Sequence, residues 1–92
     1  MSETRRNAVL ERAGELISGD RQTDYGDALT NFTKIADGWA LILGVDKISP
    51  HQVALCMDWV KTARLLVSPN HTDSWIDKAG YAALGAELQS RE

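Results

Sequence analysis

Apolar residues recur every three or four positions over four segments of the chain, and this spacing is typical of amphipathic helices. The first predicted helix spans about residues 3–18 and ends at Gly19, a residue that often caps helix C-termini. The second begins near Asp27, a favoured N-cap residue, and stops at Gly44. Each of these helices therefore has an apolar side that has to pack against a neighbour.

The third segment has the clearest helix start in the sequence. Ser49 stands at the N-cap, Pro50 at the first helical position, and Gln52 three residues after the serine, as in a capping box. The helix is predicted to run to about Val67, because Pro69 prevents its continuation. Apolar residues cover most of its circumference, so we expect it to be the central and most buried helix.

Small residues dominate the fourth segment, which starts at Thr72 or Asp73 and runs to about Leu88. Each glycine inside a helix costs about 1 kcal/mol relative to alanine, so a close neighbouring helix, from this subunit or another, would explain Gly80 and Gly85. The alternative is that these positions are poorly optimised. With no strand pattern anywhere, the sequence predicts an all-α four-helix bundle that oligomerises through its helix faces.

Size and charge restrict the classes of function. The 92 residues, 1–92, form a single helical domain, and with one cysteine there is no disulfide, so self-association into a homo-oligomer would add burial. Cys56 is expected to be a buried small hydrophobe. The net charge of −3 disfavours binding of a nucleic-acid polymer, and the apolar stretches are too short for a membrane span. We expect a cytoplasmic protein with no membrane partner.

Charged residues on the third predicted helix follow a regular spacing. Asp58, Lys61 and Arg64 stand at i, i+3 and i+6, which places them along one face. One interpretation is a solvated edge stripe with an Asp–Lys pair. The other is that Lys61 and Arg64 project into a cleft and hold phosphate oxygens.

Acidic residues begin the fourth predicted helix. Asp73 and Asp77 lie one turn apart, with Tyr81 one turn further. Such a carboxylate pair is a candidate metal half-site, since Mg²⁺ takes oxygen ligands and often shares them with substrate phosphates. The competing interpretation is an internal salt bridge from Asp77 to Arg64 or Lys61. No cofactor is required by the pattern, and Mg²⁺ enters only if the protein is an enzyme.

The stretch GDRQTDYG, residues 19–26, combines turn residues with ligand-binding chemistry. Its glycines and Asp20 fit a polar loop between helices. Arg21 adds a planar donor fork, and Tyr25 adds a ring that can stack on a base. Asn31 extends the same polar surface on the second helix. The predicted ligand-binding residues are therefore Arg21, Tyr25, Asn31, Lys61, Arg64 and Asp77.

The ordered set GDRQTDYG, NFTKIADGW, VALCMDWVKTARL and DSWIDKAGYAAL resembles a family of small helical phage and prophage proteins, mostly without an assigned activity. The last of these is also distantly similar to the final core helix of MazG-like all-α nucleoside triphosphate pyrophosphohydrolases. Those enzymes hold Mg²⁺ with ExxE and ExxD motifs. Here Asp73 and Asp77 match ExxD loosely, with a spacing of four, and the second and third helices contain no ExxE.

Three functions follow from these residues and resemblances. The first is a binding module in which assembled subunits enclose a nucleotide or cyclic nucleotide, sequestering an immune signal in the cytoplasm of an infected bacterial host. The second is a Mg²⁺-dependent MazG-like pyrophosphohydrolase with Asp73 and Asp77 as metal ligands. The third is a protein-interaction module with no small-molecule ligand.

Overall fold

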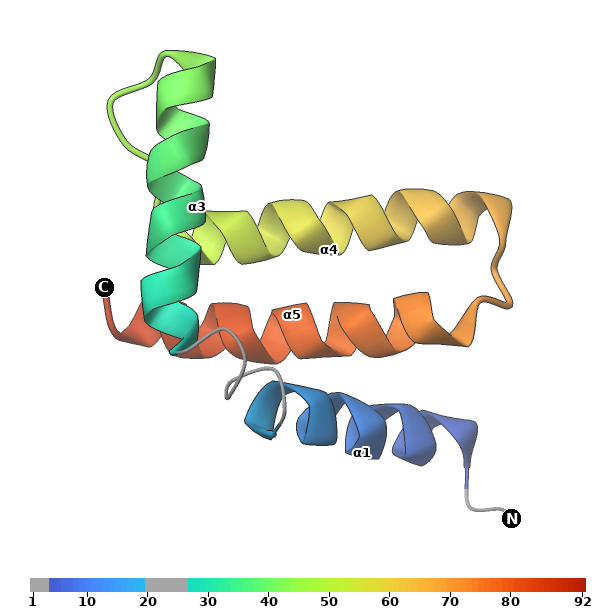
Figure 1. Ribbon diagram of the computed structural model, residues 1–92. Coiled ribbons are helices and arrows are strands. Elements are labelled where there is room, and N and C mark those ends of the chain that lie inside the picture. Colours follow the sequence, from blue (N-terminus) through green and yellow to red (C-terminus); the bar gives the residue numbers. More distant parts are fainter. Residues whose placement is uncertain (1–3, 20–26) are drawn as a thin grey trace.

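A computed structural model describes residues 4–19 and 27–92 of the chain. Over these ranges the chain forms four α-helices and no strand (Figure 1). They are α1 (Arg5–Ser18), α3 (Ala28–Leu43), α4 (Pro50–Val67) and α5 (Thr72–Ser90). The predicted all-α class is confirmed, and the predicted helix ends agree with these bounds to within two residues.

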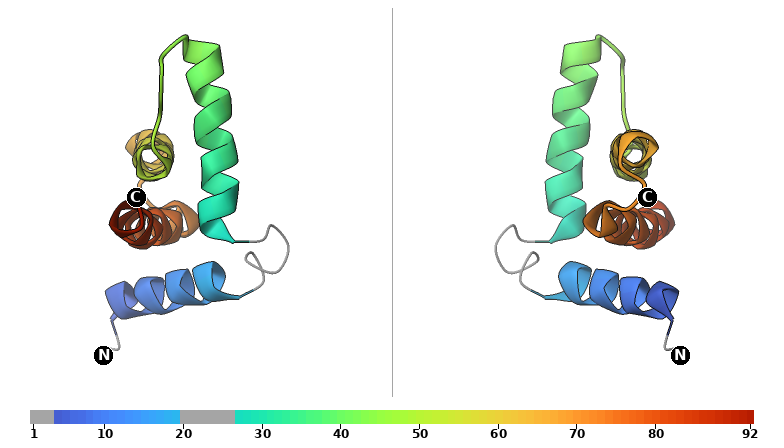
Figure 2. Two further views of the ribbon diagram at one scale, coloured as in Figure 1. Left: turned by 90° about the vertical axis from the view of Figure 1, so that its left-hand side faces the viewer. Right: turned by 90° about the vertical axis from the view of Figure 1, so that its right-hand side faces the viewer.

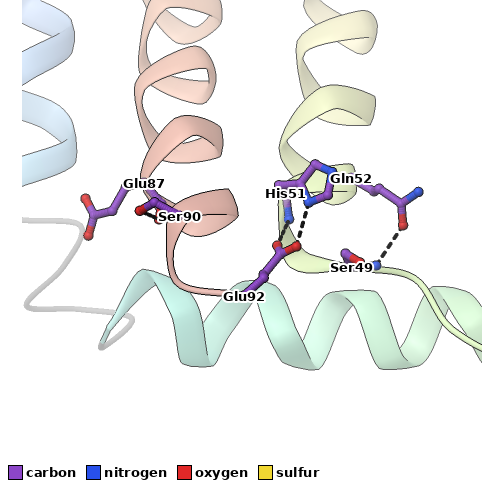
Figure 3. A network of polar contacts seen from close by, with 6 residues as sticks. All are labelled: Ser49, His51, Gln52, Glu87, Ser90 and Glu92. Carbon is purple, nitrogen blue, oxygen red and sulfur yellow. Dashed lines mark hydrogen bonds and ion pairs between the residues drawn. The ribbon is translucent and has the colours of Figure 1, made fainter.

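Local side-chain chemistry begins and ends these helices as the sequence indicates. The Asp27 carboxylate accepts a hydrogen bond from the Thr30 N–H at 3.3 Å and so caps α3. Gly44 ends α3 with a φ of +70°, a left-handed conformation that favours glycine. At the start of α4, the Ser49 N–H donates to the Gln52 side chain at 2.7 Å, as predicted for a capping box (Figure 3).

Three helices lie side by side and the fourth crosses them. Helix α5 lies between α1 and α4, and α3 crosses α4 and α5 near the end where α4 begins and α5 ends (Figure 1). In the views along α4 and α5, the C-terminal half of α3 extends beyond α4 (Figure 2). The arrangement therefore differs from a regular up-and-down bundle. None of the described helices is long and apolar enough to cross a membrane.

The core lies where α3 crosses the other helices. Phe32, Val53 and Leu88, from α3, α4 and α5, are buried together there. Helix α5 is the central helix, because it contacts each of the other three. The prediction that α4 would be the most buried helix is wrong, since side chains such as Trp59 and Leu66 on its outer side are exposed. Periodicity shows which sides of a helix are apolar, but not how many of them have a neighbour.

The small residues of α5 allow its neighbours to come close. A Cβ atom on Gly85 would lie 3.2 Å from the Cβ of Ala54 on α4, and one on Gly80 would lie 3.3 Å from a methyl group of Ile17 on α1. The predicted close approach is confirmed at both glycines. The neighbours that approach are helices of the same chain, α4 at Gly85 and α1 at Gly80.

Candidate functional site

The predicted salt bridge of Asp77 is formed with Lys61. The Lys61 Nζ lies 3.0 Å from Asp77 Oδ2, and the two side chains are 12% and 19% exposed. Between the two predicted partners, the structure therefore selects Lys61 over Arg64. Because both groups are mostly buried, each supplies the opposite charge that makes burial of the other tolerable.

A second ion pair also joins α4 to α5, but here the lysine is on α5 and the aspartate is on α4. The Lys78 Nζ of α5 lies 3.0 Å from Asp58 Oδ1 and donates to the Thr62 hydroxyl at 2.6 Å. That hydroxyl in turn donates to the Asp58 carbonyl at 3.2 Å. Asp58 thus pairs across to α5, and not along α4 with Lys61 as the edge-stripe interpretation required. The two pairs together are neutral and join α4 to α5.

Arg64 has a different environment from Lys61. It is exposed and forms none of the ion pairs found among the described residues. It borders an open groove on the C-terminal half of α4, and neither Lys61 nor Asp77 lines this groove. The lining residues are Trp59, Val60, Ala63, Arg64, Val67, Ser68 and His71. The two cations predicted to hold phosphate together therefore have separate surroundings.

The remaining predicted site residues are placed in part. Asn31 is half-buried in the first turn of α3, and Asp73 is exposed in the first turn of α5. Arg21 and Tyr25 lie outside the described residues, so a cleft that they share with the others stays a prediction.

The surroundings of Asp77 bear on the predicted Mg²⁺ half-site. The described residues contain no group of three or more His, Cys, Asp or Glu side chains that could hold a metal ion. Mg²⁺ at Asp77 would compete with the Lys61 ammonium. The crevice beside Asp77, between α1 and α5, has a volume of about 20 Å³, which is room for one water molecule and not for a nucleotide. The metal assignment of Asp73 and Asp77 stays a prediction.

A large exposed apolar surface was not predicted from the sequence. We use the name α3–α4 apolar surface for the large exposed apolar side chains of α3, of α4 and of the turn between them, which are Leu41, Ile42, Leu43, Val45, Leu55, Trp59, Val60, Leu66 and Val67. Cys56 is also exposed on α4, which makes its predicted burial wrong. The signal was present in α4, whose apolar residues cover more of the helix than its neighbours can bury.

These features define a small all-α domain with paired charges inside and an exposed apolar surface outside. The chain belongs to the family described as "Domain of unknown function (DUF6378)", which matches residues 8–89. The predicted resemblance to a small phage family is confirmed in this form.

Two relatives come from mycobacteriophages. The chain is 36% identical over 85 residues to the Gene 55 protein of Mycobacterium phage L5, covering 92% of this chain and 54% of that protein. It is 40% identical over 75 residues to the Gene 55 protein of Mycobacterium phage D29, covering 82% of this chain and 49% of that protein. The chain thus spans about half the length of the curated relatives it matches. No solved structure matches it significantly.

Proposed function

We propose that this domain is a protein-interaction module that docks a protein on the α3–α4 apolar surface. The observation that carries the proposal is the exposure of nine large apolar side chains on α3, on α4 and in the turn between them. The largest apolar patch on a typical monomer is about 300–600 Å² and often functional. Nine side chains this exposed, gathered on two neighbouring helices and their connecting turn, expose a total apolar area of at least that order, and leaving it in water is unfavourable by about 25 cal/mol for each Å².

The composition of the surface supports a protein partner. The outward positions of α4 that include Leu55, Cys56, Trp59, Ala63 and Leu66 carry no charge. The centres of protein–protein interfaces are likewise depleted in charged residues and rich in aromatic ones. Trp59, exposed near the middle of α4, has the residue type that most often contributes the largest share of binding energy.

The ion pairs between α4 and α5 also fit this function. The Lys61–Asp77 and Asp58–Lys78 pairs hold α4 against α5 with complementary charges on the inner side. The outer side is therefore presented on a helix whose position is already fixed, and a preformed surface loses less conformational entropy on binding. In this proposal Lys61 and Asp77 position α4 and do not contact a ligand.

The thiol of Cys56 offers a direct test, because it is the single cysteine and is exposed on α4. We expect alkylation of Cys56 in expressing cells to be slower in the wild type than in a Leu66→Glu variant, whose charge prevents docking. Leu66 is about 15 Å along the helix from Cys56, so the substitution leaves the thiol's own surroundings intact. Leu10→Glu, on an exposed position of α1, should alkylate like the wild type. Equal rates in all three proteins would rule out docking on this surface.

A second candidate, binding of a nucleotide or cyclic nucleotide, is favoured by the groove on α4. There the Arg64 guanidinium could hold phosphate oxygens and the Trp59 indole could stack on a base. In this case Arg64 acts without Lys61, whose charge is matched by Asp77. Asn31 lies on α3 at the other end of α4 and takes no part in this groove, whereas the contributions of Arg21 and Tyr25 stay predictions. Binding without turnover would fit the sequestering of a host signal.

Calorimetry against a panel of nucleotides and cyclic dinucleotides tests this second candidate. Arg64→Ala should weaken binding at least about tenfold, which corresponds to loss of one charge-assisted contact. Arg6→Ala, at an exposed position of α1, should leave the affinity unchanged. Binding no tighter than millimolar across the panel would eliminate nucleotide binding. Mg²⁺-dependent release of pyrophosphate in the same samples would instead support the predicted hydrolase.

A further inference from the structure

One stripe of α4 is covered at its beginning and open at its end. Val53, Val60 and Val67 are spaced by seven residues, nearly two helical turns, so they lie on one side of the helix. Their exposed fractions are 0%, 42% and 84%. Helix α3 packs over Val53 in the core, and further along α4 this side of the helix forms the open groove. The same stripe is therefore packed against α3 at the beginning of α4, and at the end of α4 none of the described residues covers it.

The packing stripe of α3 has the same property. Phe32, Ala36 and Ala40 are buried one turn apart, and Leu43 continues their side of the helix after three more residues. Leu43 is nevertheless 66% exposed, because the end of α3 extends beyond α4 (Figure 2). Each helix thus has an apolar stripe that is buried in its N-terminal part and exposed at its C-terminal end.

We propose that a second copy of this chain covers both open ends. Helix α3 crosses near the beginning of α4 and its end extends beyond α4, whereas Val67 lies at the opposite end of α4 (Figure 1). If two copies pack their α4 helices antiparallel about a two-fold axis, Leu43 of each copy meets Val60 and Val67 of the other. This is an isologous contact, in which the same two surfaces serve both copies. The inference rests on the proposed function and names its partner.

The available area suits a stable dimer. The nine side chains of the α3–α4 apolar surface, each between 42% and 84% exposed, offer on the order of 1,000 Å² in total, so a partner that covers most of them approaches the roughly 800 Å² per partner of a standard interface. The antiparallel arrangement uses both parts of this surface, since the end of α3 and the end of α4 each take part. A partner that covered only one helix would leave the other part in water.

The charge distribution also permits two identical surfaces to meet. Identical chains of net charge −3 repel each other, but the outward side of α4 between Leu55 and Ala63 is uncharged. Arg64 borders the groove, and its long side chain can keep the guanidinium in water while its stem lies against the interface. Self-docking therefore brings no like charges into contact at the centre.

Sedimentation equilibrium of two complementary variants tests the arrangement. The wild type should dimerise with increasing concentration, whereas Leu43→Lys and Val67→Glu alone should each raise the dissociation constant by more than about tenfold. An equimolar mixture of the two variants should dimerise again. In the mixed dimer one of the two symmetric contacts contains both substitutions, Leu43→Lys from one copy and Val67→Glu from the other, and these charges attract. The second contact keeps Leu43 and Val67 as in the wild type. Leu10→Glu should dimerise like the wild type.

Two results would overturn the second-copy inference. One is a wild type that stays monomeric at all concentrations, and the other is a mixture that stays monomeric although the wild type dimerises. Both can be separated from failure of the proposed function. If Cys56 is still protected in cells while the purified protein is monomeric, docking stands and the partner is a different protein. If Cys56 is freely alkylated in cells as well, docking itself fails. Circular dichroism of each variant verifies that the helices are formed.

Discussion

The two sides of α4 reverse the usual distribution of charged and apolar residues. Its inner side, against α5, carries Asp58 and Lys61, and both find opposite charges there. Its outer side carries exposed apolar residues such as Leu55 and Trp59 and has no charge near its centre. A surface helix of a globular protein normally has its charges outside and its apolar stripe inside. The proposed docking surface accounts for this reversal, because a partner would cover the outer side of α4.

The comparison also separates what holds the chain together from what it presents. Buried charges stabilise only when they are paired, and here the pairs join α4 to α5, which also approach each other closely where Gly85 faces Ala54. The inner side is therefore specific for α5. The proposed docking on the outer side needs only a partner with an apolar surface of matching shape. Substitutions on the inner side should change stability, and those on the outer side should change association.

The largest contrast is expected between two leucines, one on each kind of surface. Leu88 of α5 is 1% exposed and part of the core, whereas Leu55 is 64% exposed on α4. Leu88→Ala should lower the free energy of unfolding by about 2–5 kcal/mol, because it removes buried methyl groups and leaves a cavity. Leu55→Ala should change it by less than about 0.5 kcal/mol when the protein is dilute. Urea denaturation at low protein concentration measures both values.

Protein concentration sharpens this first contrast. At high concentration, the wild type should gain stability from association, and Leu55→Ala should gain less. Leu10, which is 63% exposed on α1, gives the matched control, and Leu10→Ala should behave like the wild type at every concentration. If Leu55→Ala were as destabilising as Leu88→Ala in dilute solution, Leu55 would be packed like a core residue and the outer side of α4 would not be exposed as described.

The next largest effect is expected from breaking an inner ion pair. Asp77→Asn should lower the free energy of unfolding by about 1–3 kcal/mol, because it leaves the mostly buried Lys61 ammonium without its counter-charge. Thermal and urea unfolding measure the loss. Removing both charges in Lys61→Met with Asp77→Leu should recover part of it, since no charge is then left unpaired. A double variant that loses the sum of the two single effects would show that the pair does not couple α4 to α5.

A smaller effect should distinguish a packed glycine from a free one. Gly38→Ala should raise the free energy of unfolding by up to about 1 kcal/mol, since a Cβ there meets nothing within 4 Å and alanine favours the helix. Gly85→Ala should forfeit this gain or become destabilising, because its Cβ would lie 3.2 Å from that of Ala54, which cannot rotate away. Differential scanning calorimetry of the two variants suffices. An equal gain in stability at both positions would contradict the close packing of α4 against α5 at Gly85.

The helices could be predicted from the sequence because their signals are local. The capping residues act within a few residues of their own position, and each forms the expected cap. They are Asp27, Gly44 and the Ser49–Gln52 pair. The pair Lys61–Asp77 was also foreseen as one alternative, because opposite charges on two apolar helices have few other partners.

The candidate site was harder to predict because it depends on tertiary packing. Periodicity marks Trp59 and Leu66 as apolar, and this is equally consistent with burial in the core and with exposure on an interaction surface. Which it is depends on whether a second helix lies there, and α3 covers α4 only near Val53. The spacing of Lys61 and Arg64 likewise placed both on one face, but α5 offers a carboxylate to the first alone.

The smallest predicted effect lies at the beginning of the inner side of α4. The Glu92 carboxylate accepts a hydrogen bond from the His51 N–H at 2.9 Å and lies 2.8 Å from the His51 ring (Figure 3). These contacts, the backbone N–H first, lower the pKa of Glu92 from its ordinary value of 4.5. The stabilisation is therefore complete above pH 4.5 and is lost as the pH falls through the lowered pKa.

Replacing this carboxylate should remove its stabilisation at neutral pH and, with it, one part of the acid sensitivity of the fold. Glu92→Gln should have a lower melting temperature than the wild type at neutral pH, and the difference should shrink as the pH falls below 4.5. Glu11→Gln, at an exposed position of α1, should show no such convergence. A constant difference across the acid range would mean that Glu92 stabilises the start of α4 by packing. Convergence would instead show that the charge of Glu92 helps to hold α4 from its inner side, as the ion pairs with α5 do further along the helix.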